Sequence, residues 1–455
     1  MNARQLPLPG EVSLVPASNQ SVAAERPRSN GVANKLAPAD LPAHDWYRFV
    51  LSFPPHLVRE YLARFGAGEK HLVLDPFCGT GTTLVECKKL GIPSLGLEAH
   101  PMAHFAAATK TDWSPDPDAL VVHATRAAKH AAEVLAAQGI HDTPQFANSP
   151  GNNSELHSLP QEAAQLLLTN SMSPLPLHKV LVLLDTISQY ADSSYDRHEK
   201  LALARALVTT IGNLHFGPEV GVGRIKADAA VIAPWLENVK KMASDLRLLP
   251  GEAGIPASVA LADARDMPDS IPAQSIDVVF TSPPYPNEKD YTRTTRLESV
   301  LLGFVTNNQE LRALKRTLVR SNTRNVYKDD EDHQWIEQFP EITRLANEIE
   351  EKRQKLGKTS GFERLYHRVT LLYFGGMARH FANLRRFLRP GAKLGYVVGD
   401  QASYLRVMIR TGQILARVAQ SLGYEVVGID LFRTRLATAS REQLREEVVL
   451  LRWPG

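Results

Sequence analysis

The chain has 455 residues, of which 44% are hydrophobic, and its 52 basic and 49 acidic side chains give a net charge of +3. That length is typical of two or three domains or of one large domain with insertions, and so small a net charge excludes a surface that is basic all over. The two cysteines, Cys78 and Cys87, are too few for a disulfide scaffold and fit a reducing cytoplasm, where we expect the protein to reside. No apolar run approaches the roughly 20 residues of a membrane span, and the N-terminus predicts no signal peptide.

The chain begins with a segment that predicts no fold of its own. Residues 1–42 are rich in Pro, Ala, Ser and Asn, a composition typical of a disordered tail. The second half of residues 44–66 places apolar side chains on one helical face. Residues 71–101 then predict a strand, a glycine turn, a helix and a strand, and such a βαβ unit implies a parallel sheet with a right-handed crossover.

Two insertions interrupt the predicted sheet. Residues 102–256 are dominated by helical patterns and predict a helical insertion. Its predicted helices are residues 118–138, 161–170, 198–211 and 229–248. Strands resume at residues 258–263 and 276–281. A second insertion, residues 292–362, is strongly charged.

The C-terminal part completes the sheet. Its predicted elements are a helix at 365–388, a strand at 393–400, a helix at 411–423, and strands at 424–432 and 446–453. The last two strands lack a helix-length connection, so they can pair antiparallel. The seven strands resemble the mostly parallel α/β, Rossmann-like sheet of class I S-adenosylmethionine-dependent methyltransferases, with a catalytic domain at 43–101 and 257–455. Such a fold implies no particular reaction by itself.

A glycine turn follows the first strand in "LDPFCGTGTT". Gly79 and Gly81 leave backbone N–H groups open to a ligand at a helix start. Glu98 ends the next strand, where a carboxylate can accept hydrogen bonds from both hydroxyls of a ribose. No Gly-Lys-Ser/Thr follows, so the turn is not a phosphate loop, and Leu84 stands where a dinucleotide fingerprint has its third glycine. Asp75 would accept from an ammonium group, which a methionine-type cofactor carries.

Another carboxylate ends the third predicted strand. Asp263 could accept a hydrogen bond from an adenine amino group in this type of fold. Asp266 is a competing candidate for that contact, and either residue could instead be a helix N-cap. For Glu98 the alternative is a solvated strand end, and for Cys78 simple packing is the favoured interpretation.

The fourth predicted strand ends in an unusually stiff corner, "TSPPY". Two prolines fix φ and remove two backbone donors, and the residue before each proline is pushed to extended geometry. The carbonyl groups of the corner therefore join no helix or ladder and can act as fixed acceptors beside the ring of Tyr285. An ordinary exit from a strand is the alternative for Pro-Pro alone.

Together the two motifs resemble those of the amino-group DNA methyltransferases, which methylate cytosine N4 or adenine N6. The family's FxGxG cofactor motif matches Phe77, Gly79 and Gly81, and the segment from Ser52 resembles a third family element more loosely. Its S/N/D-P-P-Y/F/W catalytic motif matches Ser282, Pro283, Pro284 and Tyr285. The resemblance covers residues 44–100 and 258–300 well and the C-terminal strands in outline. The long helical insertion departs from the pattern, and whether it is the target-recognition region stays open.

The resemblance implies S-adenosylmethionine as cofactor and double-stranded DNA as substrate. The expected cofactor-binding residues are Asp75, Phe77, Gly79, Gly81, Thr82, Glu98 and Asp263. The side chain of Ser282 and the carbonyl of Pro283 would accept hydrogen bonds from the target amine, and Tyr285 would stack on the base. Because a base inside a duplex cannot reach this corner, the nucleotide should be flipped out. No metal is required, and the His100 and His104 pair lacks the glutamate of an HExxH zinc motif.

A serine at the first motif position leans toward cytosine N4 in this family, which is the activity we expect. Adenine-N6 methylation is the alternative, and an RNA amino-methyltransferase or a catalytically silent nucleic-acid-binding subunit are further hypotheses. The recognition sequence and the oligomeric state do not follow from the sequence, which also leaves open a restriction or phage-defence partner.

Basic residues in the second insertion are candidates for binding the DNA backbone. The stretch 312–328 has a net positive charge and interleaved asparagines, which suits phosphate contacts. The alternative is a solvated helix face balanced by the acidic residues 329–332. Arg293 and Arg296, just beyond the proline corner, could contact the target strand or pair with Glu298. The candidate nucleic-acid-binding residues are Arg293, Arg296, Lys315, Arg316, Arg320 and Arg324.

Overall fold

The computed structural model describes residues 36–48, 52–143, 156–216, 219–249, 254–287, 289–436 and 443–455. Most of the predicted tail lies outside these ranges. Its last residues do not match a disordered tail, because Pro38–Asp40 and Leu41–His44 (α1) form two short helical turns. None of the helices in the described ranges combines the length and apolarity that crossing a bilayer requires.

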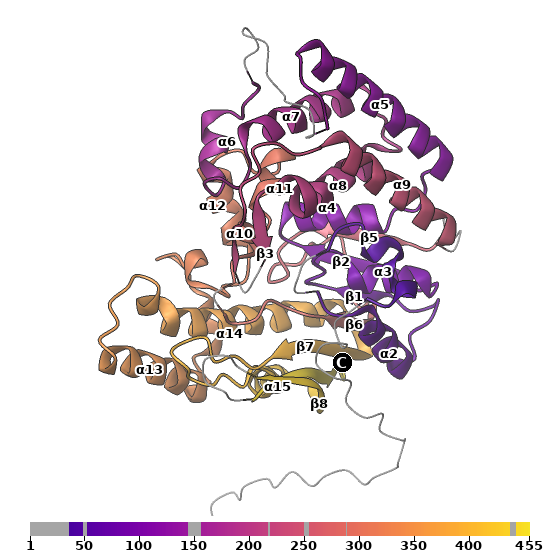
Figure 1. Cartoon of the computed structure of the whole chain (residues 1–455). Helices are drawn as coiled ribbons and strands as arrows, with labels where there is room; N and C mark the ends of the chain where they lie inside the picture. Colours follow the sequence, from indigo (N-terminus) through magenta and orange to yellow (C-terminus); the bar gives the residue numbers. More distant parts are fainter. Residues whose placement is uncertain are drawn as a thin grey trace, which may run out of the picture.

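The fold contains a seven-stranded sheet, as predicted, and its strand order is β5-β2-β1-β6-β7-β9-β8. Figure 1 labels all of these strands except β9. Its strands are β1 (Val73–Asp75), β2 (Ser94–Glu98), β5 (Ala257–Leu261), β6 (Ile276–Thr281), β7 (Leu388–Gly399), β8 (Glu425–Leu436) and β9 (Gln443–Arg452). The first five are parallel, and β9 pairs antiparallel with both β7 and β8. The order reverses between β1 and β6, and in open α/β sheets a ligand binds at the carboxyl ends of the strands at such a point.

Helices cover both faces of this sheet. On one face lie α2 (Pro55–Phe65) and α3 (Thr82–Lys89), together with α4 (Pro101–Lys110). On the other face lie α14 (Tyr366–Leu384) and α15 (Thr411–Ser421), whose apolar side chains share one core with the strands. Helix α4 begins the insertion that the sequence predicted near residue 102, and it packs both on β2 and β5 and, through Met102 and Ala106, into the core of the helical insertion.

The first insertion is a helical lobe with its own buried core. It contains α5 (Pro117–Ala137), α6 (Gln161–Leu166), α7 (Pro174–Gln189), α8 (Asp196–Ala206) with a π-helical turn, and α9 (Ile232–Leu248). The sequence analysis missed α7, whose first turn holds two prolines that resemble a loop although proline suits a helix start. It also missed the short hairpin of β3 (Leu214–Phe216) and β4 (Val220–Val222).

The second insertion is not a separate unit. Leu297 and Leu301 of α11 (Arg296–Leu301) pack into the core of the helical lobe. Further along, the turn Asp332–Ile336 lies against α14, where a Cβ atom on Gly375 would come within 1.9 Å of the Asp332 carbonyl oxygen. Glycine is therefore required there for close packing. The remaining helices of this insertion are α10 (Tyr291–Thr294), α12 (Asn308–Thr317) and α13 (Pro340–Lys355).

Candidate active site

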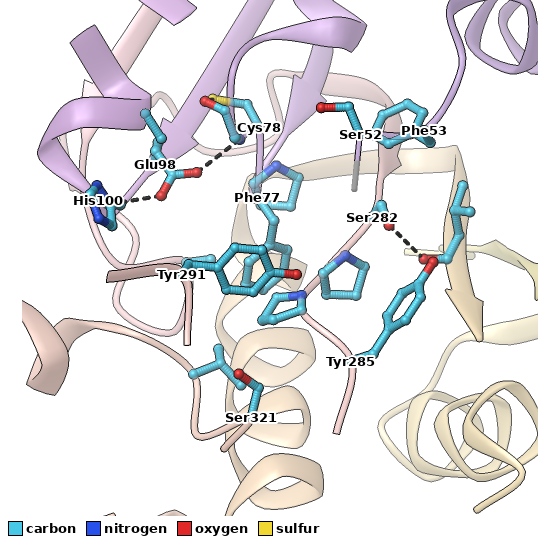
Figure 2. A pocket seen from close by; sticks show the side chains of 18 of the residues that line it. Ser52, Phe53, Phe77, Cys78, Glu98, His100, Ser282, Tyr285, Tyr291 and Ser321 are labelled. Atoms are coloured by element: carbon cyan, nitrogen blue, oxygen red, sulfur yellow. Dashed lines mark hydrogen bonds between the residues drawn. The ribbon is translucent and has the colours of Figure 1, made fainter. Parts of the chain in front are cut away.

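A cavity of about 240 Å³ opens at the carboxyl ends of β1, β2, β5 and β6 and brings the two sequence motifs together (Figure 2). From the predicted set it is lined by Phe77, Gly79, Thr82, Glu98, Asp263, Ser282, Pro283, Pro284 and Tyr285. Ser52 and Phe53, from the segment with the looser resemblance, line it as well. Asp75 and Gly81 are not part of the lining. The structure thus brings two motifs that lie about 200 residues apart in the sequence into one cavity.

The glycine turn uses its two glycines differently. Gly79 has φ +53°, lines the cavity, and has open space where a Cβ atom would project. Gly81 has φ +84°, and a Cβ atom there would lie 3.1 Å from the Cβ of Ala107 on α4. Gly81 therefore allows close packing of the turn against α4, and its expected role as a direct cofactor contact stays a prediction.

Glu98 is held by the backbone of the turn. Its Oε2 accepts a hydrogen bond from the Gly79 amide at 2.8 Å, and its Oε1 accepts one from the His100 amide at 2.8 Å (Figure 2). Each oxygen keeps a second lone pair, so the carboxylate can still accept from a diol. Burial raises the pKa of Glu98 to about 7, against the opposing effect of these backbone hydrogen bonds.

We expect cofactor affinity to rise with pH across this value. Donors on a ribose favour the charged carboxylate, so binding should release a proton from Glu98 and weaken as the pH falls below about 7. Glu98→Gln should lower affinity for S-adenosylmethionine by roughly tenfold to a hundredfold at pH 8. Isothermal titration calorimetry between about pH 6 and 8 measures both effects. A Glu98→Gln variant that keeps the wild-type affinity and pH dependence would remove Glu98 from the site.

Asp75 lies beneath the cavity instead of lining it. The residue is fully buried, and its Oδ1 accepts from the Thr281 hydroxyl at 2.5 Å and from the Phe77 amide at 3.2 Å. Burial raises the pKa of Asp75 to about 6. Because Thr281 immediately precedes Ser282, Asp75 links the glycine turn to the proline corner. Its Oδ2 has no hydrogen-bond partner among the described residues, and the expected contact with an ammonium group stays a prediction.

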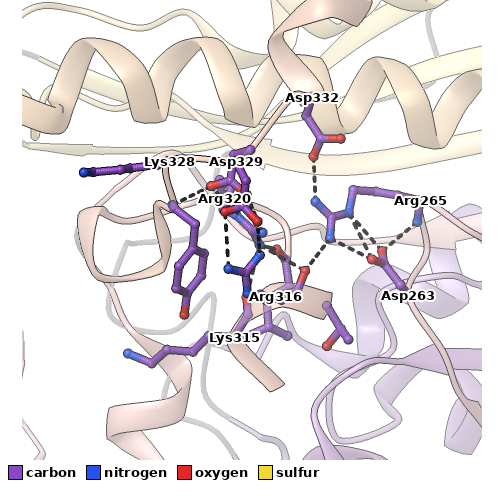
Figure 3. A network of polar contacts seen from close by, with 12 residues as sticks. Asp263, Arg265, Lys315, Arg316, Arg320, Lys328, Asp329 and Asp332 are labelled. Atoms are coloured by element: carbon purple, nitrogen blue, oxygen red, sulfur yellow. Dashed lines mark hydrogen bonds and ion pairs between the residues drawn. The ribbon is translucent and has the colours of Figure 1, made fainter. Parts of the chain in front are cut away.

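Asp263 lines the cavity, but its carboxylate is already engaged (Figure 3). It accepts from the Arg265 backbone amide at 2.9 Å and from the Arg265 guanidinium at 2.7 to 3.1 Å. The opposite side of that guanidinium pairs with Asp332 at 2.6 Å. Asp266, the competing candidate, is exposed and does not line the cavity. The sequence analysis missed Arg265, because nothing in its spacing shows that a distant aspartate completes the pair.

The proline corner points into the cavity from the end of β6 (Figure 2). The Ser282 hydroxyl donates to the Val397 carbonyl of the neighbouring strand at 3.1 Å. The oxygen can accept hydrogen bonds through its lone pairs, although a hydrogen bond with the Tyr285 phenol already engages this hydroxyl. Tyr285 packs beside Gly399, where a Cβ atom would lie 3.1 Å from the tyrosine ring. Burial raises the pKa of Tyr285, which keeps the phenol protonated.

The sequence analysis also missed residues that complete the walls. Tyr291 lines the cavity, with a pKa raised to about 12 by burial. Below Phe77, the His380 ring packs edge to face at 4.9 Å, donates to the Ala264 carbonyl and accepts from the Tyr396 hydroxyl. No motif marks either position.

The two histidines of the glycine-turn region bind different partners. His100 Nε2 lies 3.0 Å from the Thr295 hydroxyl, whereas His104 Nε2 lies 3.2 Å from the Val259 carbonyl. Among the residues that the structure describes, no group of three or more His, Cys, Asp or Glu side chains is arranged to hold a metal ion.

Two of the predicted phosphate contacts, Lys315 and Arg320, form ion pairs with acidic residues. Lys315 Nζ lies 3.1 Å from Asp290, with side chains 13% and 2% exposed. Arg320 is 4% exposed and binds Asp330 with two nitrogens as well as three backbone carbonyls. The acidic run thus balances Arg320 through Asp330, whereas Lys315 pairs with Asp290 outside that run, so these two cations are less available to DNA than the sequence predicted.

The other four candidates differ in accessibility. Arg296 donates to the Thr292 and Leu166 carbonyls and so joins the proline-corner segment to the end of α6, a structural role that corrects its prediction. Arg316 pairs with Asp329 at 2.7 Å and lies over the Tyr327 ring. Arg324 is 29% exposed and lies 3.8 Å from Glu219. Arg293 is half-buried, and its Nε has no hydrogen-bond acceptor within the described ranges.

Comparisons with known proteins agree with this fold. A family model described as a DNA methylase matches residues 28–108, which include the glycine turn and Glu98. The Type II methyltransferase M.BsoBI of Geobacillus stearothermophilus is 25% identical over 445 residues, which cover 90% of this chain and 84% of that protein. The Type II methyltransferase M.AvaI of Nostoc sp. is 23% identical over 446 residues, which cover 91% and 87%. M.MjaII of Methanocaldococcus jannaschii is 38% identical over 68 residues, covering 15% of this chain and 12% of that protein.

The strand order, the cavity at its reversal point and the glycine turn define a class I methyltransferase fold. Taken with the two motifs, the matches support the amino-group DNA methyltransferase family for this chain, as the resemblance predicted.

Proposed function

We propose that this protein transfers a methyl group from S-adenosylmethionine to the N4 amino group of cytosine in DNA. The observation that carries the proposal is the Ser282 hydroxyl, which lines the cavity, donates to the Val397 carbonyl and can accept through its lone pairs. An aspartate at this position leans toward adenine in the family, so the serine favours cytosine. Adenine N6 is the second candidate, since its exocyclic amine has the same chemistry. The Type II names of the relatives support a role beside a restriction enzyme.

The residues of the glycine-turn side fit the proposed cofactor. Glu98 offers two backbone-held oxygens to a ribose diol, and Phe77 offers an aromatic face supported by His380. Gly79 leaves open space beside its amide, so a ligand can approach the turn closely. When bound, the cofactor supplies a methyl group on a positively charged sulfur, which is strongly activated for transfer.

The proline-corner side provides the acceptors for the base. The lone pair of an exocyclic amine is delocalised into the ring, and accepting its hydrogen bonds through Ser282 Oγ and the Pro283 carbonyl draws it toward tetrahedral geometry. Tyr285 provides the surface on which a flipped base stacks. These groups are fixed before the reaction by the Val397 hydrogen bond and by the prolines, so their contribution is preorganised positioning and electrostatics.

Tyr285→Ala should weaken capture of the flipped base, because stacking contributes about 1–3 kcal/mol per base in single-strand binders. Tyr285→Phe keeps the ring and should have a mild effect. We would measure binding of an oligonucleotide with the target base already unpaired, alongside cofactor binding as a test of folding. If Tyr285→Ala binds that oligonucleotide as tightly as Tyr285→Phe does, the ring does not stack on the base.

Nucleoside mass spectrometry after expression in a methylation-free host tests the proposed function. DNA from cells with the wild-type protein should contain N4-methylcytosine, and DNA from cells with the Ser282→Ala variant should contain far less. N6-methyladenine in place of N4-methylcytosine would select the second candidate. Methylated RNA with unmodified DNA would contradict a DNA methyltransferase, and the absence of any product would favour a catalytically silent DNA-binding subunit.

A further inference from the structure

Three cations that the sequence analysis did not single out lie around the mouth of the cavity. Lys289 follows the proline corner, and Arg433 and Arg435 lie on β8; all three line the cavity. Glu446 of β9 is the carboxylate placed between the two arginines and also lines the cavity. This cluster is separate from the glycine-turn side.

The two arginines share that carboxylate unequally. Arg433 Nε donates to Glu446 Oε2 at 2.5 Å, and its side chain is only 16% exposed. Arg435 Nε lies 3.3 Å from Glu446 Oε1 but is not aligned for a hydrogen bond, and it has no other acceptor among the described residues. The Arg435 side chain is 43% exposed. Arg433 is therefore anchored, whereas Arg435 keeps donors for another anion.

The surroundings of Lys289 add to the positive charge. Burial lowers the pKa of Lys289, and the nearby positive charge of Arg435 lowers it further, against the opposing effect of Glu219. Glu219 in turn lies 3.8 Å from Arg324. Four cations thus face two carboxylates, and holding like charges this close is unfavourable unless an anion binds between them. Such a cluster suits a phosphate group, which accepts from arginine at two oxygens.

The cluster lies beside the tyrosine of the proline corner. Glu446 raises and Arg435 lowers the pKa of Tyr285, although burial is the largest cause of its shift, so both charges are close to the phenol. Gly399 makes this arrangement possible, because a Cβ atom there would lie 3.1 Å from the Tyr285 ring and 3.4 Å from Glu446. A base stacked on Tyr285 would therefore bring its own backbone phosphates to the mouth of the cavity.

We propose that Lys289 and Arg435 bind a phosphodiester of the target strand next to the flipped nucleotide, with Arg433 and Glu446 holding Arg435 in place. The assignment of the target strand rests on the proposed function, whereas the binding of a nucleic-acid phosphate does not. A phosphate contact is blind to sequence, so it should add affinity for any duplex and release counterions.

The test uses the full chain and two duplexes of unrelated mixed sequence, each of about 30 base pairs, in salt from about 50 to 200 mM. Fluorescence anisotropy gives the affinity of the wild type and of the Lys289→Ala, Arg435→Ala and Arg435→Gln variants. Each variant should bind both duplexes more weakly and lower the slope of log affinity against log salt by about 0.9. Arg435→Gln serves if Arg435→Ala does not fold.

Arg389→Ala is the matched control. Arg389 is also an arginine with one carboxylate partner, Asp277, at 2.9 Å and is 50% exposed, but it lies at the opposite end of the same sheet. The Arg389→Ala variant should keep the wild-type slope of log affinity against log salt. If all cluster variants keep the wild-type slope of log affinity against log salt, the proposal is overturned. A loss of affinity for only one of the two duplexes also overturns it, because that result would indicate a contact with a base. Nucleoside analysis distinguishes the proposed function from the proposed phosphate site. Methylated DNA together with an unchanged slope would support the proposed function and contradict the phosphate site. A lowered slope without methylated DNA would support the phosphate site and contradict the proposed function.

Discussion

Ser282→Ala is expected to lower the single-turnover rate of DNA methylation by about a hundredfold or more, while cofactor affinity stays at the wild-type value. The substitution removes one acceptor of the target amine and leaves the Pro283 carbonyl and the glycine-turn side in place. The interaction strengthens as the amine becomes tetrahedral, so its loss should affect turnover more than binding. The size of the effect follows from preorganisation, because the Val397 carbonyl already fixes the hydroxyl at 3.1 Å.

Ser275→Ala provides the control for this measurement. Ser275 immediately precedes β6 at its amino end, and its hydroxyl donates to the Pro272 carbonyl at 2.7 Å, far from the cavity along the same strand. The Ser275→Ala variant should methylate DNA at the wild-type rate. Quenched-flow assays with saturating enzyme report the chemical step without product release. Near-wild-type rates for both Ser282→Ala and Tyr285→Ala would contradict the mechanism, and the proline corner would then be an ordinary strand exit.

The sequence predicted the sheet and the two motifs because each signal is local. A glycine turn after one strand and "SPPY" after another identify strand ends, and parallel strands place their carboxyl ends along one edge. Glu98 was predictable for the same reason. The role of Asp75 was not, since its carboxylate is buried against Thr281 and only the three-dimensional pairing of β1 with β6 reveals it.

The basic residues could not be assigned from sequence, because ion-pair partners are set by tertiary packing. The stretch 312–328 has many cations, but Lys315 turns toward Asp290 and Arg320 toward Asp330. Conversely, Arg435 lies near the end of β8, and the sequence pattern there predicts a strand but does not indicate that Arg435 lines the cavity. Net charge along a segment therefore did not show which cations reach the cavity.

Arg265→Ala is expected to destabilise the protein strongly, by about 3–5 kcal/mol, because it leaves the buried carboxylate of Asp332 and the partly buried carboxylate of Asp263 without their guanidinium partner. Arg265 is 5% exposed and lies between Asp263 at the cavity wall and Asp332 of the second insertion (Figure 3). Its guanidinium also donates to the Arg316 carbonyl at 3.0 Å. Arg379, 3.3 Å from Asp332, compensates only part of the loss.

The same guanidinium joins Asp263 at the cavity wall to Asp332 of the second insertion, so its loss should affect both the stability of the protein and the cavity wall. Arg265→Lys keeps the charge but cannot form the fork with both aspartates, so its thermal midpoint should lie between those of Arg265→Ala and the wild type. Arg452→Ala removes an exposed pair with Glu425 at 2.8 Å and should change stability by at most about 1 kcal/mol. Thermal and urea unfolding of the cofactor-free proteins provide the comparison. If Arg265→Ala unfolds at the same midpoint as Arg452→Ala, the buried pairs contribute no net stability, and the apolar packing of the second insertion, together with the Asp332 turn on Gly375, holds it in place.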